Sequence, residues 1–210
     1  MKLSALFESC LSASYLSTEN GGDYAVEKKD GTVYIYLESS DGIEDWKNNL
    51  SFERMPYERE GKTAFYAHAG FLRVFLSILP HIEAEIAHPE NCRFTVVGFS
   101  HGGALAVLLH EHILYRRPEL LGRVEGYGFG TPRVLTFPWR RAWRECFANF
   151  TVIRNGNDAV THLPPRALGY YHVGRLLEIG SPDAYSSIDA HRPENILKEL
   201  YLWERKNAEK

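Results

Sequence analysis

The chain of 210 residues lacks several features that mark specialised classes of protein. It has only three cysteines, Cys10, Cys92 and Cys146, whose odd number and wide spacing match neither a disulfide framework nor a metal motif. We therefore expect free thiols, buried or half-buried. No stretch approaches the ~18 apolar residues of a membrane-spanning helix, and no run is rich in lysine and arginine. The sequence predicts no metal, no transmembrane segment and no nucleic-acid partner.

The amino-terminal segment also lacks the unbroken apolar core of a signal peptide. Glu8 interrupts it directly after Phe7, whereas Leu3, Phe7 and Leu11 recur at a spacing that favours an amphipathic helix. The expectation is a cytoplasmic protein. Export without a leader, or a leader already trimmed, is the alternative.

Strand-like and helix-like segments alternate along a chain whose length fits one domain over residues 1–210. Residues 38–63 are polar and irregular, and no element is expected there. The expected strands are 24–28 and 32–37, paired through an Asp-Gly turn, then 93–99, 123–130, 150–155 and 176–180; the expected helices are 3–16, 71–86, 102–115 and a last one from Pro193. This order predicts an α/β fold with a mainly parallel sheet, helices on both faces, and a site beyond the carboxyl ends of the strands.

A single serine stands between glycines at the junction of strand 93–99 and the helix that follows. The pattern Gly98-Phe99-Ser100-His101-Gly102 is weak alone, but a strand before it and a helix after it are what a nucleophile elbow requires. Glycines leave room where strand and helix approach closely. Ser100 is therefore a candidate nucleophile, and an ordinary strand-to-helix loop is the alternative.

A serine hydroxyl needs a base, usually a histidine oriented by a carboxylate, and in this fold class the chain order is serine, acid, histidine. Asp158 lies where strand 150–155 opens into a polar loop, whereas Asp183 and Asp189 lie in a polar stretch typical of turns. Several histidines are unsuitable as the base by position: His101, His110, His112 and His162. His172 and His191 remain, and the residues alone do not choose between them.

An ester hydrolase also needs donors for the oxyanion of its tetrahedral intermediate. The residue after the nucleophile supplies one backbone N–H, here that of His101. The second donor is expected after another central strand, where strand 32–37 runs into Ser39 and Ser40.

Six segments, in order, resemble the class 3 lipases, the fungal-type triacylglycerol lipases and their bacterial relatives. They cover most of residues 30–175: LESSDGIEDWKNNLSF, AHAGFL, VVGFSHGGALAVL, GYGFGTPRV, VIRNGNDAVTHLPP and GYYHVG. The resemblance implies an α/β-hydrolase fold with Ser100 as nucleophile and Asp158 as acid. It implies Ser40 as the oxyanion serine, with the His101 N–H as its partner. His172 falls on a structural His-x-Gly element, so the resemblance selects His191, near the carboxyl terminus, as the base.

The chain departs from the family pattern around the candidate site. Leu37-Glu38-Ser39 replaces Phe-Arg-Gly, Phe99 replaces a histidine, and His101 replaces a leucine. The lid-like residues 41–49 are short and charged, with Ile43 and Trp46 as their large apolar side chains; these two and Phe99 are the candidate substrate or lid residues. Such a lid favours shorter or more soluble esters.

The sequence thus predicts a serine carboxylic-ester hydrolase of the lipase or esterase type that cleaves acylglycerols or related lipid esters through an acyl-enzyme. No cofactor is required, and transient contact with a lipid interface is expected. A phospholipase A1 or another esterase on the same residues is the first alternative. A catalytically silent binding or signalling module is the second.

Overall fold

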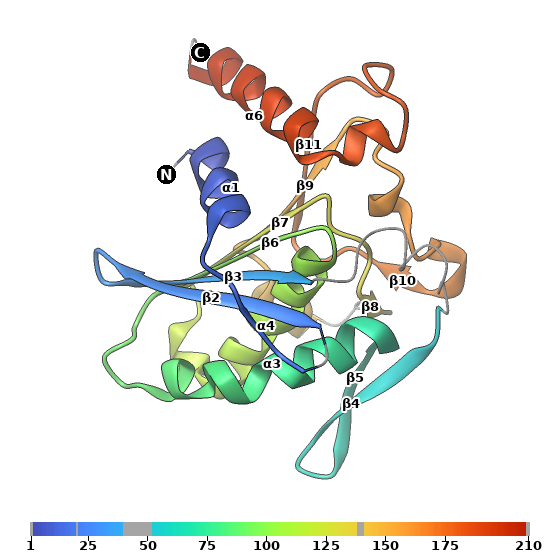
Figure 1. Ribbon diagram of the computed structural model, residues 1–210. Coiled ribbons are helices and arrows are strands. Elements are labelled where there is room, and N and C mark those ends of the chain that lie inside the picture. Colours follow the sequence, from blue (N-terminus) through green and yellow to red (C-terminus); the bar gives the residue numbers. More distant parts are fainter. Residues whose placement is uncertain (1, 20, 40–51, 138–140, 209–210) are drawn as a thin grey trace.

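The computed structural model describes residues 2–19, 21–39, 52–137 and 141–208 (Figure 1). Its main sheet has seven strands. Their order is β1 (Leu16–Ser17), β2 (Gly22–Lys29), β3 (Thr32–Ser39), β6 (Phe94–Phe99), β7 (Val124–Phe129), β9 (Phe150–Asn155) and β11 (Arg175–Ile179). In this sheet β3, β6, β7, β9 and β11 are parallel to one another, whereas β2 pairs antiparallel with both β1 and β3. The predicted mainly parallel sheet is confirmed.

Two hairpins turn on a residue pair with positive φ. Asp30 (φ 50°) and Gly31 (φ 72°) join β2 to β3, as the Asp-Gly signal predicted. Glu60 (φ 50°) and Gly61 (φ 72°) join β4 (Arg54–Arg59) to β5 (Lys62–His68). Because β3 extends to Ser39 and the β4–β5 hairpin begins at Arg54, the prediction of no element over residues 38–63 is wrong at both ends of that range. Much of β4 and β5 is exposed, and in β4 only Tyr57 is buried, so the hairpin shows little of the apolar pattern of a core strand.

A second, antiparallel sheet lies beside the first. Its strands are β10 (Tyr170–Tyr171), β8 (Leu135–Thr136), β5 and β4, in that order. Single-turn helices occupy several connections: η1 (Pro118–Leu120), η2 (Val160–His162), η3 (Arg166–Leu168) and η4 (Asp189–His191).

Helices cover both faces of the main sheet (Figure 1). One face carries α3 (Ala69–Ala87) and α4 (His101–Arg116), and the other carries α1 (Leu3–Ser12) and α6 (Pro193–Ala208); α5 (Arg141–Cys146) is short. Side chains alternate along each strand, so Val96 belongs to the core under α3 and α4 and its neighbour Val97 to the core under α1 and α6. Strand β6, which ends directly before Ser100, is thus buried on both faces.

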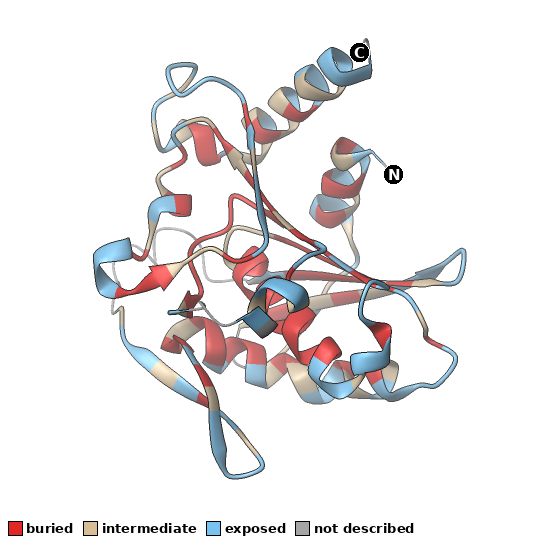
Figure 2. Ribbon diagram, turned by 180° about the vertical axis from the view of Figure 1, so that it is seen from behind, coloured by how far each residue is buried: buried red, intermediate tan, exposed pale blue. Residues whose placement is uncertain are grey.

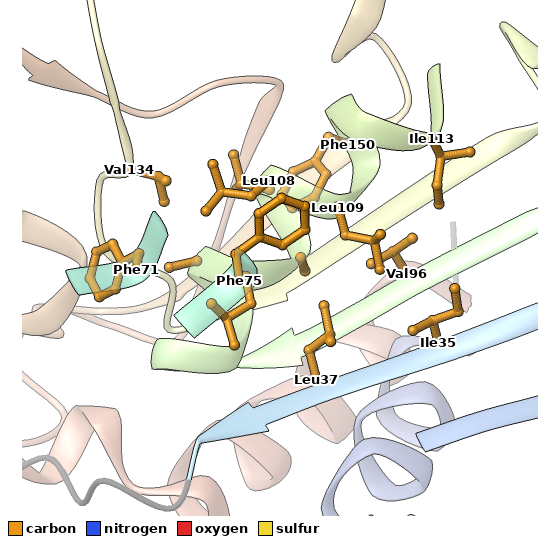
Figure 3. Packing of buried hydrophobic residues seen from close by; sticks show 14 of the residues in the cluster. Ile35, Leu37, Phe71, Phe75, Val96, Leu108, Leu109, Ile113, Val134 and Phe150 are labelled. Carbon is orange, nitrogen blue, oxygen red and sulfur yellow. The ribbon is translucent and has the colours of Figure 1, made fainter. Parts of the chain in front are cut away.

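The larger core lies between the sheet, α3 and α4 (Figure 3). Helix α4 is buried from Gly102 to Leu114, as the red ribbon in Figure 2 shows. Each large apolar side chain that is fully buried contributes about 1.5–3 kcal/mol to the stability of the fold. The packing of α4 in this core therefore holds the start of the helix, next to Ser100, in place. The cysteines are free as expected, with Cys10 buried and Cys92 and Cys146 half-buried.

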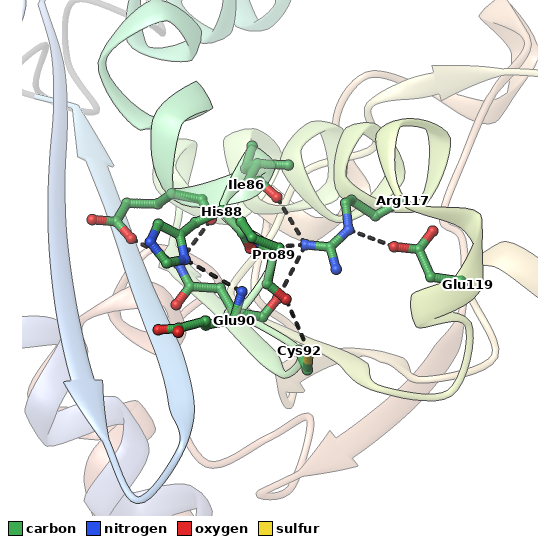
Figure 4. Close-up of polar contacts among 9 residues, drawn as sticks. Ile86, His88, Pro89, Glu90, Cys92, Arg117 and Glu119 are labelled. Carbon is green, nitrogen blue, oxygen red and sulfur yellow. Dashed lines mark hydrogen bonds and ion pairs between the residues drawn. The ribbon is translucent and has the colours of Figure 1, made fainter.

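Arg117 closes the end of the α3–α4 layer (Figure 4). Its Nη1 donates to the backbone carbonyl oxygens of Ile86 (3.2 Å), His88 (3.1 Å) and Asn91 (3.2 Å). The last carbonyls of a helix have no partner within the helix, and a cation there also matches the helix dipole. Arg117 therefore joins the end of α4 to the end of α3.

We expect Arg117→Ala to lower the free energy of unfolding by about 1–3 kcal/mol, because partly buried carbonyl groups lose a charged donor. Urea unfolding measures the difference. Arg123→Ala, which changes an exposed arginine nearby, is the control and should have little effect. Equal effects of the two substitutions would contradict this role of Arg117.

Candidate active site

The backbone at Ser100 has the strained conformation expected of a nucleophile elbow. Its φ is 53° and its ψ is −118°, between the last residue of β6 and the first of α4. A Cβ added to Gly98 would lie 2.1 Å from the Gly102 oxygen, and one added to Gly102 would lie 1.9 Å from the Leu37 oxygen. Only glycine lets β3, β6 and α4 approach this closely. The spacing of glycines in the motif is thus a steric requirement.

The structure brings Ser100, His191 and Asp158 together in one hydrogen-bonded chain. His191 Nε2 lies 2.9 Å from Ser100 Oγ, and His191 Nδ1 lies 2.8 Å from Asp158 Oδ2. A carboxylate only accepts hydrogen bonds, so Nδ1 donates and Nε2 keeps a lone pair toward the serine hydroxyl. The arrangement can take a proton from Ser100.

The ends of parallel strands deliver these side chains to one edge of the sheet. Asp158 follows β9, and His191 ends η4, which follows β11. The Asp158 side chain is fully buried, and its Oδ1 accepts a hydrogen bond from the Val160 N–H at 2.9 Å. Both carboxylate oxygens therefore have donors, which holds the carboxylate in one orientation.

Two functional residues were missed by reasoning from the sequence. A Cβ on Gly130, which has φ 57°, would lie 2.7 Å from His191 Cε1, so this glycine makes room for the imidazole. Asn155 is fully buried and its Nδ2 donates to the Ala190 carbonyl oxygen at 3.0 Å. Asn155 thus links the end of β9 to the residue before His191. The available signal was its place three residues before Asp158.

The second candidate base, His172, lies elsewhere. Its Nε2 donates to the Thr161 carbonyl oxygen at 2.8 Å, and burial lowers the pKa of His172 to about 4. His172 therefore supports the acid loop as a neutral side chain. Asp189 accepts a hydrogen bond from Ser186 Oγ and pairs with Arg192, so it is a turn residue as expected.

Of the two predicted oxyanion donors, His101 and Ser40, the structure describes only His101. The His101 N–H begins α4, where the first amides of a helix have no partner within the helix. Burial, and to a lesser extent electrostatic repulsion from the neighbouring His68, lowers the pKa of the His101 side chain to about 4. Ser40, Ile43 and Trp46 lie outside the described residues, so their assigned roles stay predictions.

Phe99, predicted to contact substrate or lid, has its ring against two other side chains. It stacks on His191, with ring centroids 5.0 Å apart, and meets Phe7 of α1 edge-on at 5.6 Å. Its predicted contact with substrate stays a prediction.

Within the described ranges, no group of three or more histidine, cysteine, aspartate or glutamate side chains is placed to hold a metal ion. Among the same residues, no helix has both the length and the apolar character that crossing a membrane demands.

Comparison with known proteins identifies relatives of this site. The model of the family described as lipase (class 3) matches residues 34–168. A lipase from Rhizomucor miehei is 31% identical over 157 residues, which cover 68% of this chain and 40% of the relative. The solved structure of the Rhizomucor miehei triacylglyceride lipase is 28% identical with a TM-score of 0.62, over 81% of this chain and 66% of that one. The predicted α/β-hydrolase fold is confirmed.

A further relative bears on the expected cellular location. It is the Malassezia restricta protein named "Secreted mono- and diacylglycerol lipase LIP2", 31% identical over 112 residues, which cover 50% of this chain and 35% of the relative. The cytoplasmic expectation is wrong by this comparison, because it rested on the absence of a leader and this relative is a secreted protein. The chain spans less than half the length of the two curated relatives named here.

We expect stability to fall as the pH drops from about 6.5 to about 4. Burial lowers the pKa of His101, His110 and His172 from 6.5 to about 4, so the unfolded chain binds more protons than the folded one in this window. Each histidine contributes a slope of at most about 1.4 kcal/mol per pH unit.

Glutamine in place of His172 keeps a donor for the Thr161 carbonyl oxygen but does not titrate. In His172→Gln the free energy of unfolding, measured with urea at each pH, should therefore fall less steeply between about pH 6.5 and about pH 4. His88→Gln, at an exposed position, is the control. A slope unchanged in His172→Gln would contradict the assignment of a neutral His172.

Proposed function

Because the chain belongs to the class 3 lipase family, we propose that it is a serine carboxylic-ester hydrolase acting on lipid esters. One observation carries the proposal: Ser100 Oγ, held in the strained elbow, lies 2.9 Å from a histidine that lies 2.8 Å from a buried aspartate. A serine, a base and an orienting carboxylate in this order are the parts that acyl transfer requires.

In the proposed acylation, Ser100 Oγ attacks the ester carbonyl carbon while His191 Nε2 takes the hydroxyl proton. Asp158, bonded to Nδ1, holds the ring and stabilises the imidazolium that forms. The carbonyl oxygen becomes an oxyanion, which the His101 N–H and Ser40 are proposed to bind. When the tetrahedral intermediate collapses, His191 gives its proton to the leaving alcohol.

Deacylation repeats these steps with water as the nucleophile. His191 Nε2 removes a proton from water, which attacks the acyl carbon, and the proton then returns to Ser100 Oγ as the acid leaves. The described side chains supply the proton transfers of both halves, and the proposal invokes no metal or cofactor.

The substrates we propose are short-chain or partly soluble acylglycerols, met through transient contact with a lipid interface. The short, charged segment 41–49 supports the first part, because a lid with a wide apolar face is absent from its sequence. Ile188 supports the second: it lies three residues before His191 and is 59% exposed.

Ser100→Ala should lower kcat on p-nitrophenyl butyrate by at least about 10⁴-fold, because the nucleophile is lost while binding is kept. Ser14→Ala, at an exposed serine of the same chain, is the control and should keep full activity. Circular dichroism checks that both variants are folded. Wild-type rates in purified Ser100→Ala would refute the mechanism.

Substrate preference is tested with tributyrin below and above its solubility limit, with triolein and with phosphatidylcholine. We expect dissolved tributyrin to be hydrolysed, only a several-fold rise above the limit, and slower turnover of triolein. Activity confined to emulsions would contradict the substrate proposal. Preferred release of fatty acid from phosphatidylcholine would favour the phospholipase A1 alternative.

A further inference from the structure

We propose that Phe99 is a positioning residue that stabilises the protonated His191 imidazole during ester hydrolysis. The inference rests on the hydrolase function proposed above. The two rings are stacked, with centroids 5.0 Å apart and planes inclined by 23°. The phenyl ring therefore covers one face of the imidazole, whereas Asp158 and Ser100 contact its two nitrogen atoms.

The position of the Phe99 ring follows from the alternation of side chains along β6. Val97 faces the core under α1 and α6, and Phe99, two residues on, packs against the same core. Phe7 of α1 meets the Phe99 ring edge-on, with planes inclined by 67°. Phe7 in turn stacks on Phe129, with centroids 4.5 Å apart. Phe7 and Phe129 are fully buried, so Phe7 of α1, itself backed by Phe129 of β7, supports the Phe99 ring from the core.

The chemistry of a stacked ring distinguishes the two protonation states of His191. The face of a phenyl ring carries partial negative charge, so it attracts a positively charged imidazolium more strongly than it attracts a neutral imidazole. His191 becomes a cation when it takes the proton of Ser100, so this attraction grows along the reaction coordinate. Removing the ring should weaken the base and raise the barrier together.

Other ionisable groups around the two rings are the same in every variant compared. Asp158 faces Nδ1 of His191. Asp189, the first residue of η4, forms an ion pair with Arg192, the residue that follows η4. Near Phe99, burial raises the pKa of Cys10 to about 12, so the thiol is neutral, and burial beside Asp23 raises the pKa of Glu38. A difference between variants therefore reports the ring.

The test compares two variants without a ring, Phe99→Leu and Phe99→Met, with Phe99→Tyr, which keeps one. Phe94→Leu is the matched control, because Phe94 is a buried phenylalanine of the same strand that belongs to the core on the opposite face. The readouts are kcat, KM and the pH profile of kcat/KM on p-nitrophenyl butyrate.

The variants without a ring should lose about three- to tenfold in kcat with little change in KM, and the acidic midpoint of the profile should move down by about 0.5 to 1 pH unit. Phe99→Tyr should keep the wild-type midpoint, and so should Phe94→Leu. A merely structural role would lower activity without moving the midpoint.

The result that overturns the inference is a midpoint in folded Phe99→Leu and Phe99→Met that equals that of the wild type, or an equal shift in Phe94→Leu. The imidazole titration of His191, followed by NMR in the Ser100→Ala background, gives the same comparison without turnover. It should show the same downward shift when the ring is removed. An inactive wild type would refute the proposed function, whereas an unmoved titration would refute the stacking role alone.

Discussion

The close approach of β6, β3 and α4 around Ser100 is the constraint on which the rest of the site depends. A single methyl group at Gly98 or Gly102 would lie about 2 Å from backbone atoms, so these elements meet only because both positions lack a side chain. The burial of α4 on all sides supplies the packing energy that holds Ser100 in its strained conformation. The strained backbone at Ser100 therefore depends on the tight packing of α4 behind it.

The other two side chains reach Ser100 through loops tied to each other. Asn155 bonds the carbonyl before His191, and the Ala159 N–H donates to the Ser187 carbonyl oxygen at 3.1 Å. Two hydrogen bonds therefore join the loop that carries Asp158 to the loop that carries His191. Gly130 leaves the space into which the imidazole fits, and Phe99 closes one face of that ring. Together these contacts place the His191 imidazole beside the Ser100 hydroxyl.

Local features could be predicted from the sequence, and long-range ones could not. The elbow and Asp158 follow from a strand, glycines and a polar loop within a few neighbouring residues. Choosing His191 over His172 needed the family resemblance, because the deciding contacts join residues 91 and 33 positions apart. The β4–β5 hairpin was missed because it buries few side chains, and the wrong cellular location rested on a leader that the sequence did not show.

In the proposed mechanism, Ser100 carries the activated hydroxyl of this site. Peptide mapping by mass spectrometry, after reaction of the folded protein with a fluorophosphonate, tests it most directly, because such reagents phosphonylate activated serines. We expect a single adduct, on the peptide that carries Ser100. Labelling should be much slower in Asp158→Asn, because asparagine no longer holds His191 in the required tautomer. Folded protein that stays unlabelled, or that is labelled on another serine, would contradict this mechanism.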